Sequence, residues 1–199
     1  MNSRLREAIA AYDPSASLPE AATIPSAWYT DPAMLDLERR QVFARSWQLV
    51  ARVDQVRQPG RFVTADVAGE PIMVVRGRDE VLRGFFNVCR HHAAEVLTEP
   101  AGCAKSLRCP YHGWTYSLEG ELKGVPEFDG VRNFDKSQNG LVPIRVDTWE
   151  QFVFVCLDPR APELTDFLGK LPAHVARLNI SDLKFFERRT YKIRCNWKV

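Results

Sequence analysis

"NVCRHHAAEVLTEPAGCAKSLRCPYHGW", residues 87 to 114, contains three of the chain's five cysteines and three of its four histidines. Within this stretch, the pairs Cys89-x-His91 and Cys109-x-x-His112 are separated by seventeen residues. Each pair follows a short β-like run, "FFNV" before the first and "KSLR" before the second. Two loops at neighbouring sheet ends can present two thiolates and two imidazoles to one metal centre.

The way in which the ligand types are paired separates two metal hypotheses. Structural zinc sites typically take two cysteines from one sequence pair and two histidines from another. Here each loop supplies one cysteine and one histidine. This mixture favours a two-iron, two-sulfide cluster in which one iron takes both thiolates and the other takes both imidazoles. A zinc-stabilised structural module is the alternative.

The remaining cysteines and histidines near these loops are predicted not to be ligands. His92 follows His91 directly, so in an extended loop its side chain would point away from the metal, although it could still donate a hydrogen bond nearby. Cys103 is predicted to be a bystander thiol, because the other four ligands complete the set. Cys156 lies in the apolar run "FVFVCL" and is predicted to be a core residue. Cys195 receives no role.

Outside the loops, the sequence predicts a mainly β, antiparallel domain flanked by helices. Short β-like runs with turns between them and no intervening helices indicate this class; they are "WQLVARV", "RFVTADV", "EPIMVVR", "VLRGFFNV", "GWTYSLEGEL", "LVPIRVDTW" and "QFVFVCL". A helix is predicted to begin at Asp31-Pro32. The predicted segments are an N-terminal leader and helix (1–46), the β domain (47–159), a linker helix (160–182) and a further strand (183–199).

Composition excludes several other classes. The formal net charge is +2 and 45% of residues are hydrophobic, which is typical of a globular protein and does not indicate a nucleic-acid partner. No apolar run approaches the ~20 residues that a membrane span requires. The N-terminus shows no secretory signal. The number of cysteines is odd, and two of the five lie in C-x-H and C-x-x-H contexts, which indicates metal chemistry in a reducing compartment. We therefore expect a cytoplasmic protein.

The motif "CRHH…CPYHGW" resembles the cluster motif of the Rieske-type non-haem iron oxygenase large (alpha) subunits. The resemblance extends to "WYTDPAML…ERRQVFARSWQLV", "GLVPIRVDTW" and the closing "NWKV". It implies a Rieske [2Fe–2S] domain with a cluster-binding subdomain, in which Cys89 and Cys109 bind one iron and His91 and His112 the other. It also implies that Trp114 packs against the cluster and that Arg90 flanks the first loop.

Departures from the respiratory Rieske proteins narrow this resemblance. Where those proteins carry an additional cysteine in each loop, joined as a disulfide, this chain has Ala94 and Tyr111. Where they carry a serine that donates to the cluster, this chain has Trp114. Fewer hydrogen bonds to the sulfurs predict a potential at the low end of the Rieske range. The first loop reads C-R-H-H-A, which resembles the choline monooxygenase branch more than the ring-hydroxylating members with C-R-H-R-G.

A complete family member also has a mononuclear iron held by two histidines and one carboxylate. Only His92 and His174 remain after the cluster is assigned, so we expect no catalytic residue in this chain and no substrate turnover by it alone. Residues 183–199 would then be the first strand of a truncated catalytic domain.

The implied role is electron transfer from a reductase or ferredoxin to a mononuclear Fe(II) in the catalytic domain of the same or a neighbouring subunit. The full-length protein would form a homotrimer that hydroxylates or demethylates a small organic substrate. A stand-alone Rieske ferredoxin is a second alternative.

Overall fold

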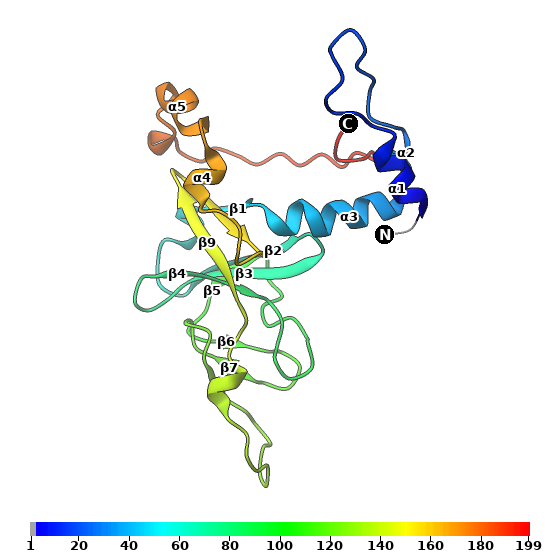
Figure 1. Ribbon diagram of the computed structural model, residues 1–199. Helices are drawn as coiled ribbons and strands as arrows, with labels where there is room; N and C mark the ends of the chain where they lie inside the picture. The colour runs from blue at the N-terminus through cyan, green and yellow to red at the C-terminus, as the bar shows by residue number, and fades with distance from the viewer. Residues whose placement is uncertain (1–2) are drawn as a thin grey trace. The chain divides into compact units, whose positions relative to one another are not determined.

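A seven-stranded antiparallel sheet forms the core of residues 43–183 in the computed structural model, which describes residues 3–199 (Figure 1). The strand order is β1-β10-β9-β4-β3-β2-β5, and every pairing is antiparallel. The strands are β1 Gln48–Arg52, β2 Arg61–Val67, β3 Glu70–Arg76, β4 Leu82–Phe86, β5 Ala101–Cys103, β9 Pro143–Trp149 and β10 Phe152–Cys156. The predicted mainly β, antiparallel class is confirmed.

Strand β3, which has a neighbour on each side in the sheet, is apolar at four consecutive positions, 72 to 75. Side chains alternate between the two faces of a strand. Ile72 and Val74 accordingly lie in one hydrophobic core, while Met73 and Val75 lie in another. All four are fully buried. Burial on both faces therefore replaces the alternating pattern of a half-exposed strand with a continuous apolar run.

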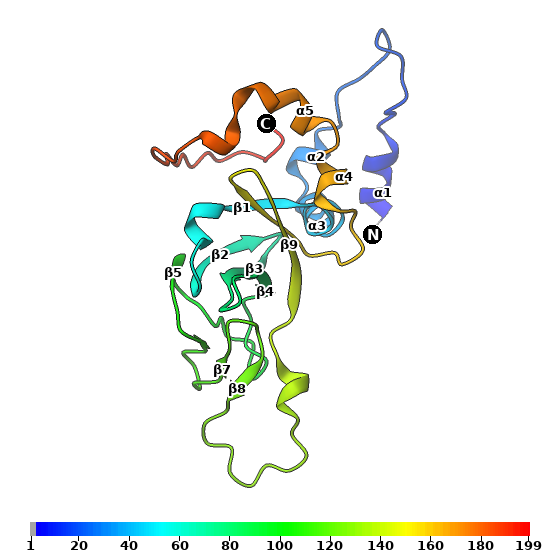
Figure 2. The same cartoon turned by 90° about the vertical axis from the view of Figure 1, so that its left-hand side faces the viewer.

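A smaller three-stranded sheet carries the two cysteine–histidine loops. Its strands are β6 Leu107–Arg108, β7 Thr115–Tyr116 and β8 Leu122–Gly124, in that order across the sheet. Figures 1 and 2 show these strands beyond one end of the seven-stranded sheet. Leu107, Tyr116 and Leu122 are buried in the same core as Met73 and Val75, so the two sheets share one hydrophobic interior.

The turn at Glu119-Gly120 joins β7 to β8 and requires its glycine. Gly120 has a φ of 91°, a left-handed conformation that is costly for other residues. A Cβ atom at this position would also lie 2.5 Å from the ring of Phe85. The turn therefore brings backbone against the core of the seven-stranded sheet, where no side chain fits.

The linker after the β domain is not one helix over residues 160–182. It forms two short helices, α4 Leu164–Leu168 and α5 Leu171–Val175, followed by two 3₁₀ turns. Gly169 ends α4 with a φ of 51°. Pro172 then stands in the first turn of α5, where proline is accepted because no helical N–H is needed. Apolar residues at helical spacing, from Leu164 to Leu171, are consistent with helix on both sides of Gly169 but do not reveal the break there.

Residues 3–42 and 184–199 form a separate unit. It contains α1 Ser3–Ala10, α2 Ala27–Thr30 and α3 Pro32–Gln41. As predicted, α3 begins after Asp31, whose carboxylate accepts a hydrogen bond from the N–H of Ala33 at 2.9 Å. Residues 1 and 2 of the predicted leader lie outside the described residues. No helix within residues 3–199 is both long and apolar enough to span a membrane.

The strand expected over residues 183–199 does not form in this structure. A strand needs a neighbour for its backbone hydrogen bonds, and no strand of residues 3–199 pairs with this tail. Side chains of the tail instead bind the N-terminal helices. Trp197 Nε1 donates to Glu38 at 2.9 Å, Lys198 Nζ lies 2.7 Å from the same carboxylate, and Asn196 donates to the carbonyl of Tyr29 at 3.0 Å.

Candidate metal centre

The two cysteine–histidine loops share one backbone conformation. In Cys89–Ala94 and in Cys109–Trp114, the N–H of the first residue donates to the carbonyl of the sixth at 2.8 Å. In both loops the N–H of the fifth residue donates back to the carbonyl of the first at 3.0 Å. The fifth residues, Ala93 and Gly113, have φ values of 57° and 73°. Each loop therefore curls around the cysteine at its start, as the paired motifs indicated.

The two thiols lie together in the protein interior. Cys89 and Cys109 are 3% and 2% exposed, neither forms a disulfide, and they lie close enough for Cys89 to contribute to the raised pKa of Cys109. Burial raises the pKa of the Cys109 thiol, while the backbone N–H groups of Tyr111 and His112 oppose that rise. A metal would have to displace the thiol protons, since the thiolate is the form that binds metal.

The imidazoles lie on the opposite, solvent-facing side of the centre. His91, His92 and His112 are all exposed, and their ligand atoms lie within 4.8 Å of one another. The rings of His91 and His112 are 4.9 Å apart. Desolvation, followed by the neighbouring His92 and His112, lowers the pKa of His91, which favours the neutral form that binds metal.

The separation of thiols from imidazoles indicates a centre larger than one ion. Within residues 3–199, those three histidines are the only set of three or more potential metal ligands close enough together for a single ion. No such set combines the two cysteines with a histidine. A tetrahedral Cys₂His₂ zinc site would place all four ligand atoms at about 2.0–2.3 Å from one ion. The described geometry fits a two-iron centre better, with one end buried and the other exposed.

The direction predicted for His92 is wrong. Its ring lies 3.9 Å from that of His91 and 5.3 Å from that of His112, so it faces the centre. The prediction assumed an extended loop in which adjacent side chains diverge. The loop instead turns tightly at Ala93, which has a positive φ, and successive side chains stay on the same side.

Tyr116 connects the two loops at their buried end, and the sequence analysis missed it. Its hydroxyl lies 3.3 Å from Cys89 Sγ and accepts the backbone N–H of Arg90 at 2.9 Å. Burial raises the pKa of Tyr116, so the hydroxyl keeps its proton and can donate to a thiolate. Arg90, predicted to flank the first loop, contributes this backbone N–H while its side chain is exposed.

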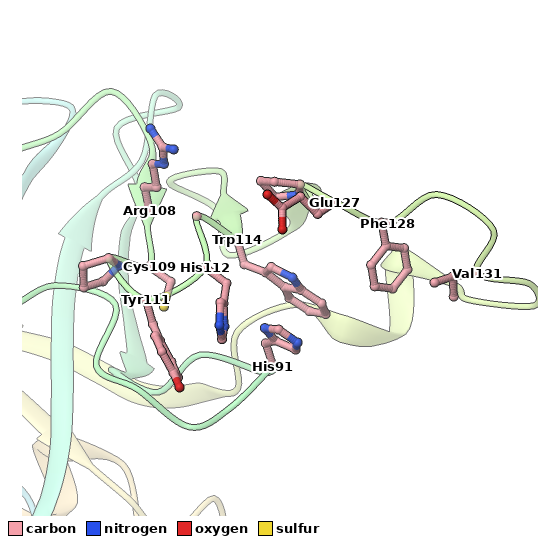
Figure 3. Close-up of a pocket in the computed structure, with 12 residues that line it drawn as sticks. His91, Arg108, Cys109, Tyr111, His112, Trp114, Glu127, Phe128 and Val131 are labelled. Atoms are coloured by element: carbon pink, nitrogen blue, oxygen red, sulfur yellow. The ribbon is translucent and has the colours of Figure 1, made fainter.

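Trp114 lies beside the exposed end of the centre. Its ring stacks on that of His91, with centroids 4.7 Å apart and planes within 1° of parallel. Figure 3 shows this stack within a cavity lined by residues of the second loop and of the segment after β8. On the outer side, Phe128 and Phe134 meet the Trp114 ring edge to face at 6.0 and 5.7 Å.

The three other cysteines and His174 do not belong to the candidate metal centre. Cys103 is exposed in β5, and Cys156 is buried in β10, as predicted for a core residue. Cys195 is exposed in the C-terminal tail. His174 lies exposed in α5, as expected of an ordinary helix histidine. None of these four residues belongs to the set of potential ligands found within residues 3–199.

Comparison with known proteins identifies the same region. The family model described as "Rieske [2Fe-2S] domain" matches residues 46–135. The chain is 39% identical over 181 residues to the carnitine monooxygenase oxygenase subunit of Escherichia coli K12, covering 90% of this chain and 48% of that protein. It is 35% identical over 208 residues to the chloroplastic choline monooxygenase of Arabidopsis thaliana, covering 99% of this chain and 49% of that protein.

Solved structures agree with these relatives. The quaternary ammonium Rieske monooxygenase CntA, crystallised with an inhibitor, superimposes with a TM-score of 0.82 at 36% identity. The match covers 89% of this chain and 50% of that one. The chain thus spans about half the length of the curated relatives it matches. Their names agree with the branch that the C-R-H-H-A loop indicated.

Proposed function

We propose that this chain is the electron-transfer portion of an oxygenase. The premise is that it carries the Rieske [2Fe–2S] domain of a Rieske-type non-haem iron oxygenase alpha subunit. When bound, the cluster takes up and releases one electron at a time. The separation of two buried thiols from two exposed imidazoles carries the proposal. This arrangement buries one end of the centre and leaves the other within reach of an electron-transfer partner.

We assign the four ligands as the motif spacing predicted. Cys89 and Cys109 would hold the buried iron, and His91 and His112 the exposed iron. The adjacent, unbridged thiols support the first pair, and the 4.9 Å separation of the two rings supports the second. The Tyr111 and His112 N–H groups directed at Cys109 would stabilise its thiolate charge.

The catalytic iron is proposed to lie outside this sequence. Once His91 and His112 are assigned, the other histidines are His92, beside the centre, and His174, in α5. They are poor candidates for one facial triad of two histidines and a carboxylate. We propose that residues 183–199 belong with the catalytic domain of the full-length protein and that this chain alone does not turn over substrate.

We propose the partners that the family resemblance implies and a substrate class taken from the names of the relatives. A reductase or ferredoxin would supply electrons, and the catalytic domain of the same or a neighbouring subunit, within a homotrimer, would receive them. The relatives named for carnitine and choline favour a quaternary ammonium substrate and a monooxygenase reaction. We propose a cytoplasmic location, because the C-x-H and C-x-x-H contexts of Cys89 and Cys109 are typical of metal-binding cysteines in a reducing compartment.

Metal analysis tests the proposal against both alternatives. Anaerobic reconstitution of the chain with iron and sulfide should give brown protein with two irons and two acid-labile sulfides. Reduction should then produce the EPR signal of a Rieske centre. Colourless protein that binds one zinc ion and no sulfide would contradict the proposal. A stand-alone ferredoxin would share the EPR signal, so the gene is also informative: an open reading frame continuing into a two-histidine, one-carboxylate pattern favours the oxygenase.

Replacing Tyr116 with phenylalanine should lower the reduction potential of the reconstituted centre. The hydroxyl 3.3 Å from Cys89 Sγ stabilises the reduced state, because reduction adds negative charge to the iron–thiolate unit. If its hydrogen bond differs by about 1 kcal/mol between the redox states, the potential should fall by about 40 mV. Protein-film voltammetry measures the change. An unchanged or higher potential in a variant with full iron content would contradict the role assigned to this hydroxyl.

A further inference from the structure

We propose that Trp114, supported by Phe128 and Phe134, is a positioning residue that fixes the ring of His91 and braces the two ligand loops at their exposed end. The inference rests on the proposed function, in which His91 is a cluster ligand. The parallel stack of Trp114 on His91 joins a residue of the second loop to a residue of the first. It is therefore a contact between loops as well as a contact with a ligand.

Two further aromatic rings, Phe128 and Phe134, pack against Trp114 and support the brace. Phe128 and Phe134 lie in the segment 125–135, which connects β8 to the 3₁₀ turn Lys136–Asn139. Their rings are 4.7 Å apart, and both meet Trp114 edge to face. Figure 3 shows the Trp114 ring next to both His91 and Phe128. Because Trp114 is only 4% exposed, it has little room to rotate away from His91.

The second proposed histidine ligand is not stacked on a buried aromatic ring. His112 stacks on Tyr111 at 3.8 Å, but the two residues belong to the same loop and this contact ties no loops together. Tyr111 is 63% exposed. The exposed iron would thus have one ligand ring stacked on a buried aromatic group and one stacked on an exposed aromatic group.

The brace complements Tyr116 and provides a noncovalent link between the loops. Tyr116 joins the loops at the thiol end, through Cys89 and the N–H of Arg90. Trp114 joins them at the imidazole end. A disulfide cannot contribute, because Ala94 and Tyr111 occupy the positions that would have to supply its sulfurs. Two aromatic residues, one at each end, hold the loops in register.

Two substitutions of Trp114 test the brace in the iron-loaded chain. Trp114→Phe keeps an aromatic ring for the stack, whereas Trp114→Leu keeps apolar bulk and removes the ring. Two readouts apply: the half-life of the cluster in an iron chelator, and the nitrogen hyperfine couplings of the two histidine ligands by pulsed EPR. Trp114→Leu should shorten the half-life about tenfold and alter one nitrogen coupling while sparing the other. The cluster of Trp114→Phe should keep a half-life in the chelator within about twofold of that in the unsubstituted chain.

Variants of the supporting segment complete the design. Phe134→Ala should reproduce the Trp114→Leu effect in weaker form, since Trp114 then loses a neighbour. Val131→Ala is the matched control, because Val131 lies in the same segment and is 52% exposed. Tyr111→Leu should alter the other nitrogen coupling and leave the half-life within about twofold. If Trp114→Leu holds no cluster, while Trp114→Phe retains it and Phe134→Ala shows the weaker effect, the brace is supported.

The outcomes distinguish the brace from the function on which it rests. Normal half-lives and unchanged couplings in Trp114→Leu and Phe134→Ala would overturn the brace and leave the electron-transfer proposal intact. Equal losses in Trp114→Phe and Trp114→Leu would also overturn it, since the aromatic ring would then be irrelevant. Absence of a Rieske EPR signal from the unsubstituted chain would remove both proposals.

Discussion

Cys109→Ser is expected to abolish the cluster, reducing the iron content of the reconstituted chain from two per molecule to none. A serine hydroxyl loses its proton far less readily than a thiol, and it is a poor ligand for iron in this setting. Solvent cannot easily take its place, because Cys109 is 2% exposed. Metal binding and local folding are coupled, so the loop Cys109–Trp114 should also lose its order. Iron and sulfide analysis, together with EPR, measures the result.

The matched control is Cys103→Ser. Cys103 is an exposed thiol in β5, and the substitution should leave both irons and the EPR signal in place. Iron loss in this variant, or retention of two irons in Cys109→Ser, would show that the ligand assignment is wrong. Because the two substitutions are chemically identical, a general effect of removing a thiol would affect both alike.

The candidate ligands were predictable because metal binding restricts residue type and spacing. Few residue types bind iron, and the C-x-H and C-x-x-H pairs leave few ways to combine them. The residues around the ligands were harder to predict. Tyr116, Phe128 and Phe134 look like ordinary core or loop aromatics in the sequence. Their roles depend on which rings the fold brings together, and local spacing carries no information about those contacts.

Strand prediction succeeded where burial left a clear pattern. The apolar run of β3 reflects two separate cores, and β2 and β10 were found within a residue or two of their observed ends. β5 was missed because Ala101–Cys103 has no apolar pattern and pairs with β2 only as a short edge strand. The linker was predicted as one helix because apolar spacing alone does not register the break at Gly169. The strand predicted at the C-terminal tail does not form, because no strand within residues 3–199 pairs with it.

The C-terminal tail is attached to α3 by side-chain contacts with Glu38. Tyr191, Ile193 and Trp197 alternate with polar residues, a pattern typical of a strand. In the structure the tail is held by side chains. The carboxylate of Glu38 in α3 receives both Trp197 and Lys198, and the paired side chains of Glu38 and Lys198 are only 10% and 13% exposed.

Lys198→Met is expected to weaken this unit strongly, because it leaves Glu38 buried without its cation. Removing one partner of a buried ion pair costs about 3–5 kcal/mol. Taking about 3 kcal/mol, the amides of α3 should exchange their hydrogens about a hundredfold faster.

Glu38→Gln in the same molecule should recover most of this loss, since the amide oxygen still accepts from Trp197 Nε1 and no charge is left buried. Lys192→Met, a change at an exposed lysine of the same tail, is the control. Hydrogen exchange followed by mass spectrometry resolves α3 from the β domain. If the α3 amides of Lys198→Met exchange within about twofold of the rate in the unsubstituted chain, the expected cost is contradicted. If the effects of the two substitutions are purely additive in the double variant, the two side chains are not energetically coupled. Coupling would mean that the N-terminal helices and the NWKV tail stabilise each other as one unit, through a contact that neither segment's own sequence pattern predicts.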